Sequence, residues 1–204
     1  MTDTPIRLSR HRLDQILTAL GAVVVVVLLV AGGLLSWGNR FAEDYVGDEL
    51  AAQNVVFPSA DALSGQGRDD LAKYGDELVD TGDEAEAYAS YIKGHVEGIA
   101  GGMTYAELSG PERAADAALN EAIANGADAD EIAALEEAAD EITGQRDSIF
   151  RGEMLRGALL NTYAWSTIGR IAGIAAIAAW IAAAAMAVLV AAGVVHTRRH
   201  HAAG

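Results

Sequence analysis

The 204-residue chain contains no cysteine. Disulfide bonds, thiol nucleophiles, cysteine-bound zinc and a lipidated cysteine anchor are therefore excluded. Any domain of this chain that lies in an oxidising compartment must be held together by packing alone.

Histidine is nearly absent from the interior of the chain, because His95 is the only one outside the two tails. A mononuclear iron or zinc catalyst needs two or three histidines around an open position. The G-x-S-x-G, GK[ST] and EF-hand patterns are missing as well. The sequence therefore predicts no metal, no cofactor and no catalytic residue, and an enzyme is the least favoured class of function.

β-strand alternation is also missing, whereas apolar residues recur at helical spacing along much of the chain. We therefore expect an all-α protein. Two long runs, residues 16–37 and 171–195, carry no charged residue. Crossing a bilayer as a helix takes about 20 apolar residues, so both runs predict transmembrane helices. A secretory signal peptide is the alternative for the first run, but the run is longer than the roughly 7–15 residues of a signal h-region.

Basic residues lie between each run and the nearer end of the chain, in "RLSRHR" before the first and "HTRRHH" after the second. The positive-inside rule then places both termini in the cytoplasm and the central region outside the plasma (inner) membrane. Arginines are expected to anchor the spans at the head groups, those of the tails on anionic lipid. They are Arg7, Arg10, Arg12, Arg170, Arg198 and Arg199.

Acidic residues concentrate between the two runs. This region holds 27 of the 29 acidic and nine of the 14 basic residues, which leaves a formal charge of −18. Such a surface repels phosphate backbones, so nucleic acid is not expected as a partner.

Turn and capping signals predict where helices begin and end in the first part of the acidic region. The first span is expected to continue as a helix through residues 41–53, and Pro58 predicts a loop after it. A weak helical turn is expected within residues 69–78. Thr81 and Glu84 form a capping box, which predicts the start of a helix.

Glycines and further capping boxes predict the remaining boundaries. The helix that begins at Thr81 is expected to end at Gly101 and Gly102. Its apolar face is expected to consist of Tyr88, Ile92, His95 and Ile99, joined by Tyr91. Gly126 is expected to end the following helix, and residues 132–149 carry the apolar stripe of the last one. The boxes expected to cap the turn and the helix after Gly102 are Thr104 with Glu107 and Ser109 with Glu112.

Small residues in the two spans allow their backbones to approach closely. Gly32 and Ser36 stand four residues apart in the first span, as do Gly169 and Gly173 near the second. Trp180 lies near the middle of the second span, so it either packs on the first span or meets a partner.

Residues 95–110, "HVEGIAGGMTYAELSG", gather the side chains that chemistry would need. The candidate ligand-binding residues are His95, Tyr88, Tyr91 and Tyr105. The alternative is that His95 packs on the tyrosines with local hydrogen bonds, and that the glycines and glutamates only cap or end helices. In an enzyme, Glu97 or Glu107 would be the acid–base partner of His95.

Three segments, "LAAQNVVFP", "YGDELVDTGDEAEAYASYIKGHVEGIAGGMTYAEL" and "FRGEMLRGALLNTYAW", resemble a family of uncharacterised two-span membrane proteins of actinobacteria. Some members of such families carry the label aromatic ring-opening dioxygenase. The histidines that would hold the iron of that enzyme are missing here, so the resemblance implies a location and no reaction.

We expect two transmembrane helices that flank a small extracytoplasmic helical bundle. The preferred function is a non-enzymatic envelope protein, an accessory subunit of a membrane complex that binds a membrane or envelope protein or forms a homo-oligomer. The alternative is an extracytoplasmic sensor that binds a ligand or a cation. The expected segments are a basic tail (1–15), the first span (16–37), the acidic domain (38–167), the second span (168–195) and a second basic tail (196–204).

Overall fold

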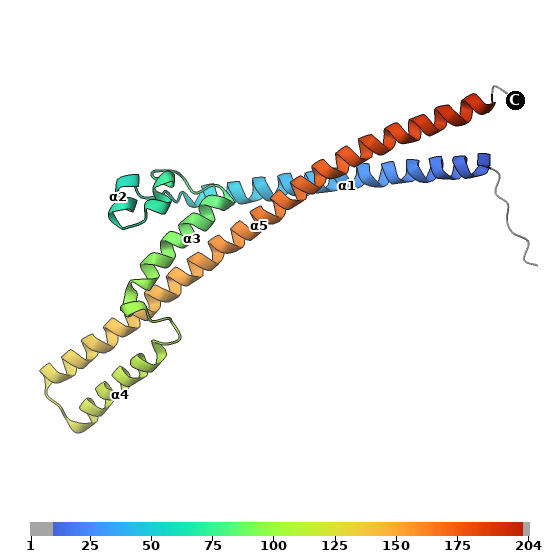
Figure 1. The fold of residues 1–204 in the computed structure, drawn as a ribbon. Coiled ribbons are helices and arrows are strands. Elements are labelled where there is room, and N and C mark those ends of the chain that lie inside the picture. The colour runs from blue at the N-terminus through green and yellow to red at the C-terminus, as the bar shows by residue number, and fades with distance from the viewer. Residues whose placement is uncertain (1–9, 202–204) are drawn as a thin grey trace, which may run out of the picture. The chain divides into compact units, whose positions relative to one another are not determined.

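The structure is a computed structural model that describes residues 10–201, and within this range it is built from helices (Figure 1). Residues 10–201 contain no β-strand, only an isolated antiparallel bridge between Val56 and Leu78. The expectation of an all-α protein is confirmed. The elements are α1 (Arg10–Gln53), α2 (Ala60–Gly65), the 3₁₀ helix η1 (Asp69–Tyr74), α3 (Gly82–Glu97), the 3₁₀ helix η2 (Ile99–Gly102), α4 (Ser109–Asn125) and α5 (Ala129–His201).

The two apolar runs belong to the two longest helices. By length and composition alone, α1 and α5 are both apolar enough to cross a membrane. Each helix extends well beyond its apolar run, and α1 continues to Gln53 as expected. The helix that starts at Ala129 continues without a break into the second run, and Gly144, Gly152 and Gly157 are all helical within it.

The described chain divides into two compact units. Residues 10–44 and 167–201 form unit 1, and residues 45–166 form unit 2. Each of the long helices contributes one part to each unit.

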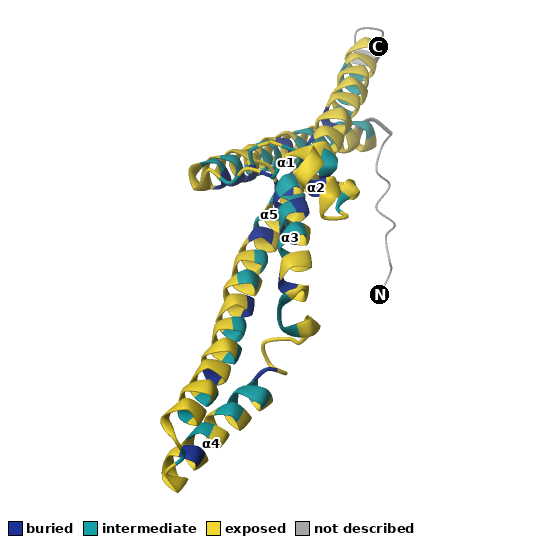
Figure 2. Cartoon of the chain, turned by 90° about the vertical axis from the view of Figure 1, so that its left-hand side faces the viewer, coloured by how far each residue is buried: buried dark blue, intermediate teal, exposed yellow. Residues whose placement is uncertain are grey.

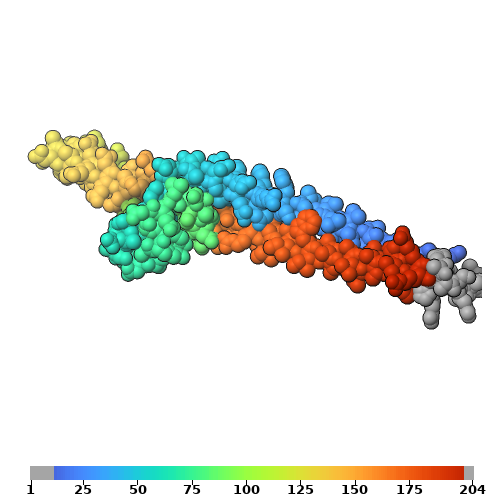
Figure 3. Space-filling model, turned by 90° about the horizontal axis from the view of Figure 1, so that it is seen from above, coloured from blue at the N-terminus to red at the C-terminus, as the bar shows by residue number. Residues whose placement is uncertain are grey.

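Unit 1 is an antiparallel pair made by the apolar parts of α1 and α5, which pack side by side (Figure 3). A Cβ atom added to Gly21 would lie 2.8 Å from Val190, and one added to Gly169 would lie 2.7 Å from the Cβ of Ala42. Residue numbers therefore rise along one helix as they fall along the other. Trp180 packs on the first span, where its indole N–H donates to the Ser36 hydroxyl at 3.1 Å.

The contact between these helices is a seam in which most residues are small or polar. Half-buried and buried positions recur at alternating steps of three and four residues, as in an antiparallel coiled coil. The seam residues are Asp14, Thr18, Gly21, Val25, Leu28, Gly32, Leu35, Asn39 and Ala42 on α1, and Gly169, Ala172, Ala176, Ala179, Ala183, Met186, Val190, Gly193 and Thr197 on α5.

Most large aliphatic side chains point away from the seam, and most of both helices is exposed (Figure 2). Leu34 is 64% exposed, Ile181 67% and Val188 69%. A protein in water buries such residues and exposes polar ones. Unit 1 has the opposite distribution, which fits a lipid environment, where small residues bring helices together.

Unit 2 has a first core cluster around Phe57. The end of α1 contributes Val46 and Leu50, and α5 contributes Leu159. Alanines of α3 complete it, because Ala85 and Ala89 are almost fully buried. The chain between α1 and α3 closes over this cluster through Leu63, Leu71 and Val79.

A second core cluster joins α3, α4 and α5. Leu108, just before α4, and Ile149 of α5 are each 1% exposed and pack with Val96 of α3. Gly152 allows this approach, since a Cβ there would overlap a methyl group of Val96.

Besides the end of α1 at Gln53, two expected helix boundaries are confirmed and two are wrong. The box between Thr81 and Glu84 caps α3, and Gly126 ends α4 in the left-handed conformation with φ of 69°. Ser109 does not cap α4, because its hydroxyl donates to the Ala106 carbonyl and Glu112 pairs with Arg146. Helix α3 ends at Glu97, before the two glycines that were expected to end it.

The buried face of α3 also differs from the expected one. Ile92 and Ile99 are half-buried and pack on the second core cluster as expected, but His95 is exposed. Alanines take the most deeply buried positions of α3, Ala85 and Ala89.

Candidate functional site

The segment between α3 and α4 lines two hollows on unit 2. After α3 ends, three successive residues have positive φ: Ala100 (52°), Gly101 (65°) and Gly102 (86°). This conformation costs an alanine roughly 1–2 kcal/mol, so the surrounding packing must impose it.

Thr104 and Glu107 then turn the chain towards α4. Glu107 accepts hydrogen bonds from the Thr104 N–H and from its hydroxyl, both at 2.8 Å, while the Glu107 N–H donates to that hydroxyl at 3.3 Å. The expected capping box is thus present. The two bonds to its carboxylate lower the pKa of Glu107.

The first hollow lies beside His95 and has a volume of about 510 Å³. The His95 ring is 4.5 Å from the ring of Tyr91, and its Nδ1 is 3.2 Å from the Tyr91 carbonyl oxygen. The lining contains no carboxylate, and it is made by Gln66, Arg68, Tyr91, Gly94, His95, Gly98 and Ile99.

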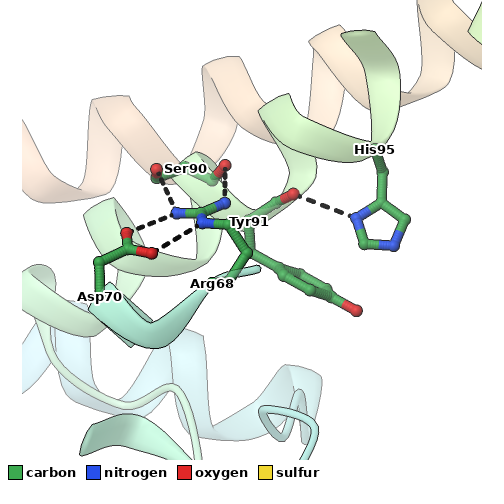
Figure 4. Close-up of polar contacts among 5 residues, drawn as sticks. All are labelled: Arg68, Asp70, Ser90, Tyr91 and His95. Atoms are coloured by element: carbon green, nitrogen blue, oxygen red, sulfur yellow. Dashed lines mark hydrogen bonds and ion pairs between the residues drawn. The ribbon is translucent and has the colours of Figure 1, made fainter. Parts of the chain in front are cut away.

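Arg68 forms one wall of this hollow and joins the loop before η1 to α3 (Figure 4). Its guanidinium donates two hydrogen bonds to Asp70 and two to Ser90, one to the carbonyl and one to the hydroxyl, all at 2.9 Å. The bonds to Asp70 raise the pKa of Arg68 and lower that of Asp70. No local sequence pattern links Arg68 to Ser90, so the sequence did not indicate that Arg68 would belong to a site.

Tyr88 does not line the first hollow, and it is half-buried against the first core cluster. Its ring meets Phe57 edge-on at 5.1 Å and lies 5.5 Å from Tyr91. Burial, with a smaller effect from Tyr91, raises the pKa of the Tyr88 hydroxyl. Its position is at the edge of this cluster.

Tyr105 lines the second hollow, which has a volume of about 480 Å³. The Arg146 guanidinium stacks 4.2 Å above its ring, and the Phe150 ring lies 5.6 Å away. The structure thus separates the four candidates: His95 and Tyr91 share one hollow, Tyr88 packs at the edge of the first core cluster and Tyr105 belongs to the other hollow.

The second hollow combines an apolar floor with charged walls. Val96 and Ile149 of the second core cluster form part of the floor. Ion pairs within α3 and α5 form the walls, Lys93 with Glu97 at 3.6 Å and Arg156 with Glu153 at 2.7 Å.

Exposed apolar side chains gather around this hollow. Met103 and Tyr105 line it and are 40% and 41% exposed. Phe150, in contact with Tyr105, is 48% exposed, and Met154, one turn further along α5, is 60% exposed. These four residues are called the Tyr105 patch below.

The candidate acid–base groups have other partners. Glu97 pairs with Lys93, and Glu107 caps the turn at Thr104. Within residues 10–201, no three His, Cys, Asp or Glu side chains lie close enough to hold a metal ion.

The anchoring arginines are described only in part. Arg7 lies outside the described residues, as does the side chain of Arg10. Arg12, Arg198 and Arg199 are exposed near the ends of α1 and α5 where the tails begin. The remaining one, Arg170, is exposed on α5 at the other end of unit 1.

The fold and these hollows define an all-helical protein with two helices apolar enough to span a membrane. No protein-family model, curated protein or solved structure matches this chain.

Proposed function

We propose that the chain is a two-pass protein of the bacterial plasma membrane, with unit 2 outside the membrane and both termini in the cytoplasm. The inverted distribution of side chains in unit 1 supports the membrane location. The arginines at the ends of α1 and α5 support the orientation. Unit 2 would then be the acidic extracytoplasmic bundle of the resembled actinobacterial family.

We further propose that unit 2 is a non-enzymatic interaction domain, an accessory subunit of a membrane complex. The Tyr105 patch is the observation that carries this proposal. Solvent-exposed Met, Phe and Tyr side chains around a hollow with an apolar floor are typical of surfaces that bind another protein. The partner would insert an apolar side chain into the second hollow.

Charge restricts the partner further. Residues 114–145, the outer part of the α4–α5 hairpin, contain nine acidic residues and no basic residue. A protein with a basic surface beside its apolar contact would be attracted to this domain, and an acidic one would be repelled.

Cysteine labelling tests the membrane arrangement. Because the chain has no cysteine, single substitutions Asn125→Cys and Ala203→Cys report on one site each. A membrane-impermeant maleimide added to intact cells should label Asn125→Cys at once and Ala203→Cys only after lysis. The reverse pattern would contradict the orientation, and extraction of the protein by alkaline carbonate would contradict membrane insertion.

Photo-crosslinking tests the interaction. A photoreactive phenylalanine analogue at Met154 should give one discrete crosslinked product in native membranes, and Met103→Glu should abolish it. The matched control places the analogue at Ile123, which is similarly exposed (51%) but lies outside the patch. Equal crosslinking from both positions, or none from Met154, would contradict the proposal.

A ligand sensor is the second candidate, supported by the hollow beside His95. Its lining has the rings of Tyr91 and His95, whereas Arg68 is already paired with Asp70, which favours a small aromatic ligand over an ion. Such a ligand should shift the NMR signals of the His95 ring, and Tyr91→Leu should remove the effect. Signals that stay unchanged across a panel of aromatic compounds would contradict this candidate.

A further inference from the structure

A third hollow, of about 500 Å³, lies in unit 1 at the end of the helix pair where the two tails begin. The part of the hollow farther from the tails is apolar. It is lined by Leu17 of α1 and by Met186, Leu189 and Val190 of α5. Leu17 is 59% exposed and Leu189 65%, so these walls face the surroundings of the helix pair.

The same hollow becomes polar towards the tails. Asp14, Thr18, His196 and Thr197 line this end. The Thr18 hydroxyl donates to the Asp14 carbonyl at 2.8 Å, and the Thr197 hydroxyl donates to the Val194 carbonyl at 2.9 Å. A molecule in this hollow would therefore meet an apolar wall at one end and hydrogen-bonding groups at the other.

The helical spacing of α5 places a basic residue, Arg199, next to the polar end of the hollow. Leu189, Ala192 and His196 follow one another at steps of three and four residues on the wall formed by α5. Arg199 is three residues beyond His196, so it stands one turn further along the same side of the helix. Asp14 is the only carboxylate among the lining residues.

We propose that this hollow binds one anionic phospholipid, with an acyl chain between Leu17 and Leu189 and the phosphate at His196 and Arg199. This inference rests on the proposed membrane insertion. The apolar lining favours a lipid over a soluble phosphate, and His196 together with Arg199, at the end of α5 where the tail begins, favours an anionic head group. The carboxylate of Asp14 places the phosphate on the side of α5.

Native mass spectrometry of the full chain in detergent, titrated with phosphatidylglycerol or phosphatidylcholine, tests the proposal. One phosphatidylglycerol should bind in preference to phosphatidylcholine. Ala192→Phe places a ring in the space that the acyl chain would occupy, so it should weaken binding roughly tenfold or more, a loss of about 1.4 kcal/mol or more. Ala191→Phe is the matched control, since Ala191 is exposed on the same helix outside the lining.

Charge variants test the head-group position. Arg199→Gln should weaken phosphatidylglycerol binding about fivefold, the contribution of one basic residue at an anionic surface. Arg40→Gln, an exposed arginine of unit 1 at the other end of α1, should leave it unchanged. Asp14→Asn should strengthen binding, because it removes the one carboxylate.

Three outcomes would overturn the proposal: equal binding of the two lipids, equal weakening by Ala192→Phe and Ala191→Phe, or displacement by glycerol phosphate alone. Carbonate extraction of the same variants keeps the two proposals apart. A protein that resists extraction but binds no lipid selectively refutes only the lipid site.

Discussion

Three glycines of α5 show how differently the same residue is used within one helix. Gly152 lets α3 approach, because a Cβ there would overlap the side chain of Val96. Gly144 and Gly157 have no atom within 4 Å of the position that a Cβ would take. Only the first is required by packing.

Alanine substitutions should separate these roles. Gly152→Ala should lower the free energy of unfolding by about 1–3 kcal/mol, because the core cannot accept the extra methyl group without shifting Val96. Gly144→Ala should raise it by roughly 0.5–1 kcal/mol, since alanine is the better helix former in open space. Urea unfolding of the full chain in detergent, followed by circular dichroism, measures both. A loss of stability in Gly144→Ala would contradict this account.

The box at Thr104 predicts a local dependence on pH. Hydrogen bonds hold the pKa of Glu107 below its usual value of 4.5. The unfolded state therefore binds the proton more readily, so this contribution to stability is complete above pH 4.5 and is lost as the pH falls through the lower, folded-state pKa. The hydrogen-exchange protection of the Thr104 N–H should fall in that acidic range, and Glu107→Gln should remove most of this dependence.

The measurement must be local because two other carboxyls of unit 2 have pKa shifts of opposite sign. Their effects on the pH dependence of overall stability therefore oppose each other. Partial burial raises the pKa of Glu84, but hydrogen bonds from Asp80 and Thr81 outweigh it and lower the pKa. Burial and the charge of Glu84 raise the pKa of Asp80. Protection of Thr104 that does not change between neutral and acidic pH would contradict the predicted role of Glu107.

Among the elements, α4 is joined to α5 by one arginine in addition to the second core cluster. Arg146 pairs with Glu112, and both side chains are mostly covered, with 24% and 19% exposed. It also stacks on Tyr105 and donates to the Tyr105 carbonyl at 3.4 Å. Elsewhere on the helix Arg151 pairs with Asp147 at 3.8 Å, with 81% and 66% exposed.

These two arginines should therefore differ when each is replaced by glutamine. Arg146→Gln should destabilise the packing of α4 by about 1–2 kcal/mol, through the lost ion pair and the lost contact with the ring. Arg151→Gln should change it by less than about 0.5 kcal/mol, as expected for an exposed pair. Hydrogen exchange of the α4 amides measures both, and equal effects would show that Arg146 does not fasten α4.

At the scale of the whole molecule, the seam of unit 1 sets the register of the two apolar helices. The absence of cysteine makes this register directly testable. Ala42→Cys with Gly169→Cys should form a disulfide on mild oxidation. A Cβ at Gly169 would overlap the Ala42 Cβ, and a separation of the two helices by about 1 Å brings the pair to the spacing of a disulfide.

The control pair is Phe41→Cys with Ile168→Cys, whose side chains are 55% and 56% exposed. A protease site introduced after Asn125 lets the disulfide be read as two fragments that stay joined until reduced. Joined fragments from the control pair, or none from Ala42 and Gly169, would contradict this register.

Sequence reasoning recovered what depends on local interactions. The helical character, the two apolar runs, the cap at Thr81, the turn at Thr104 and the end of α4 at Gly126 all follow from neighbouring residues. The third capping box failed because Arg146, 34 residues away in the chain, takes Glu112 as its partner.

The sequence by itself determined that the protein is all-helical, acidic between two apolar runs, and without disulfides, because composition and helical periodicity are properties of short stretches of chain. Only the tertiary structure decided which faces of those helices are covered. It placed Tyr88 at the edge of the first core cluster and left His95 exposed, it separated Tyr105 from them, and it set small residues of α1 against small residues of α5. The physical reason is that burial depends on contacts between distant segments, which local patterns do not encode.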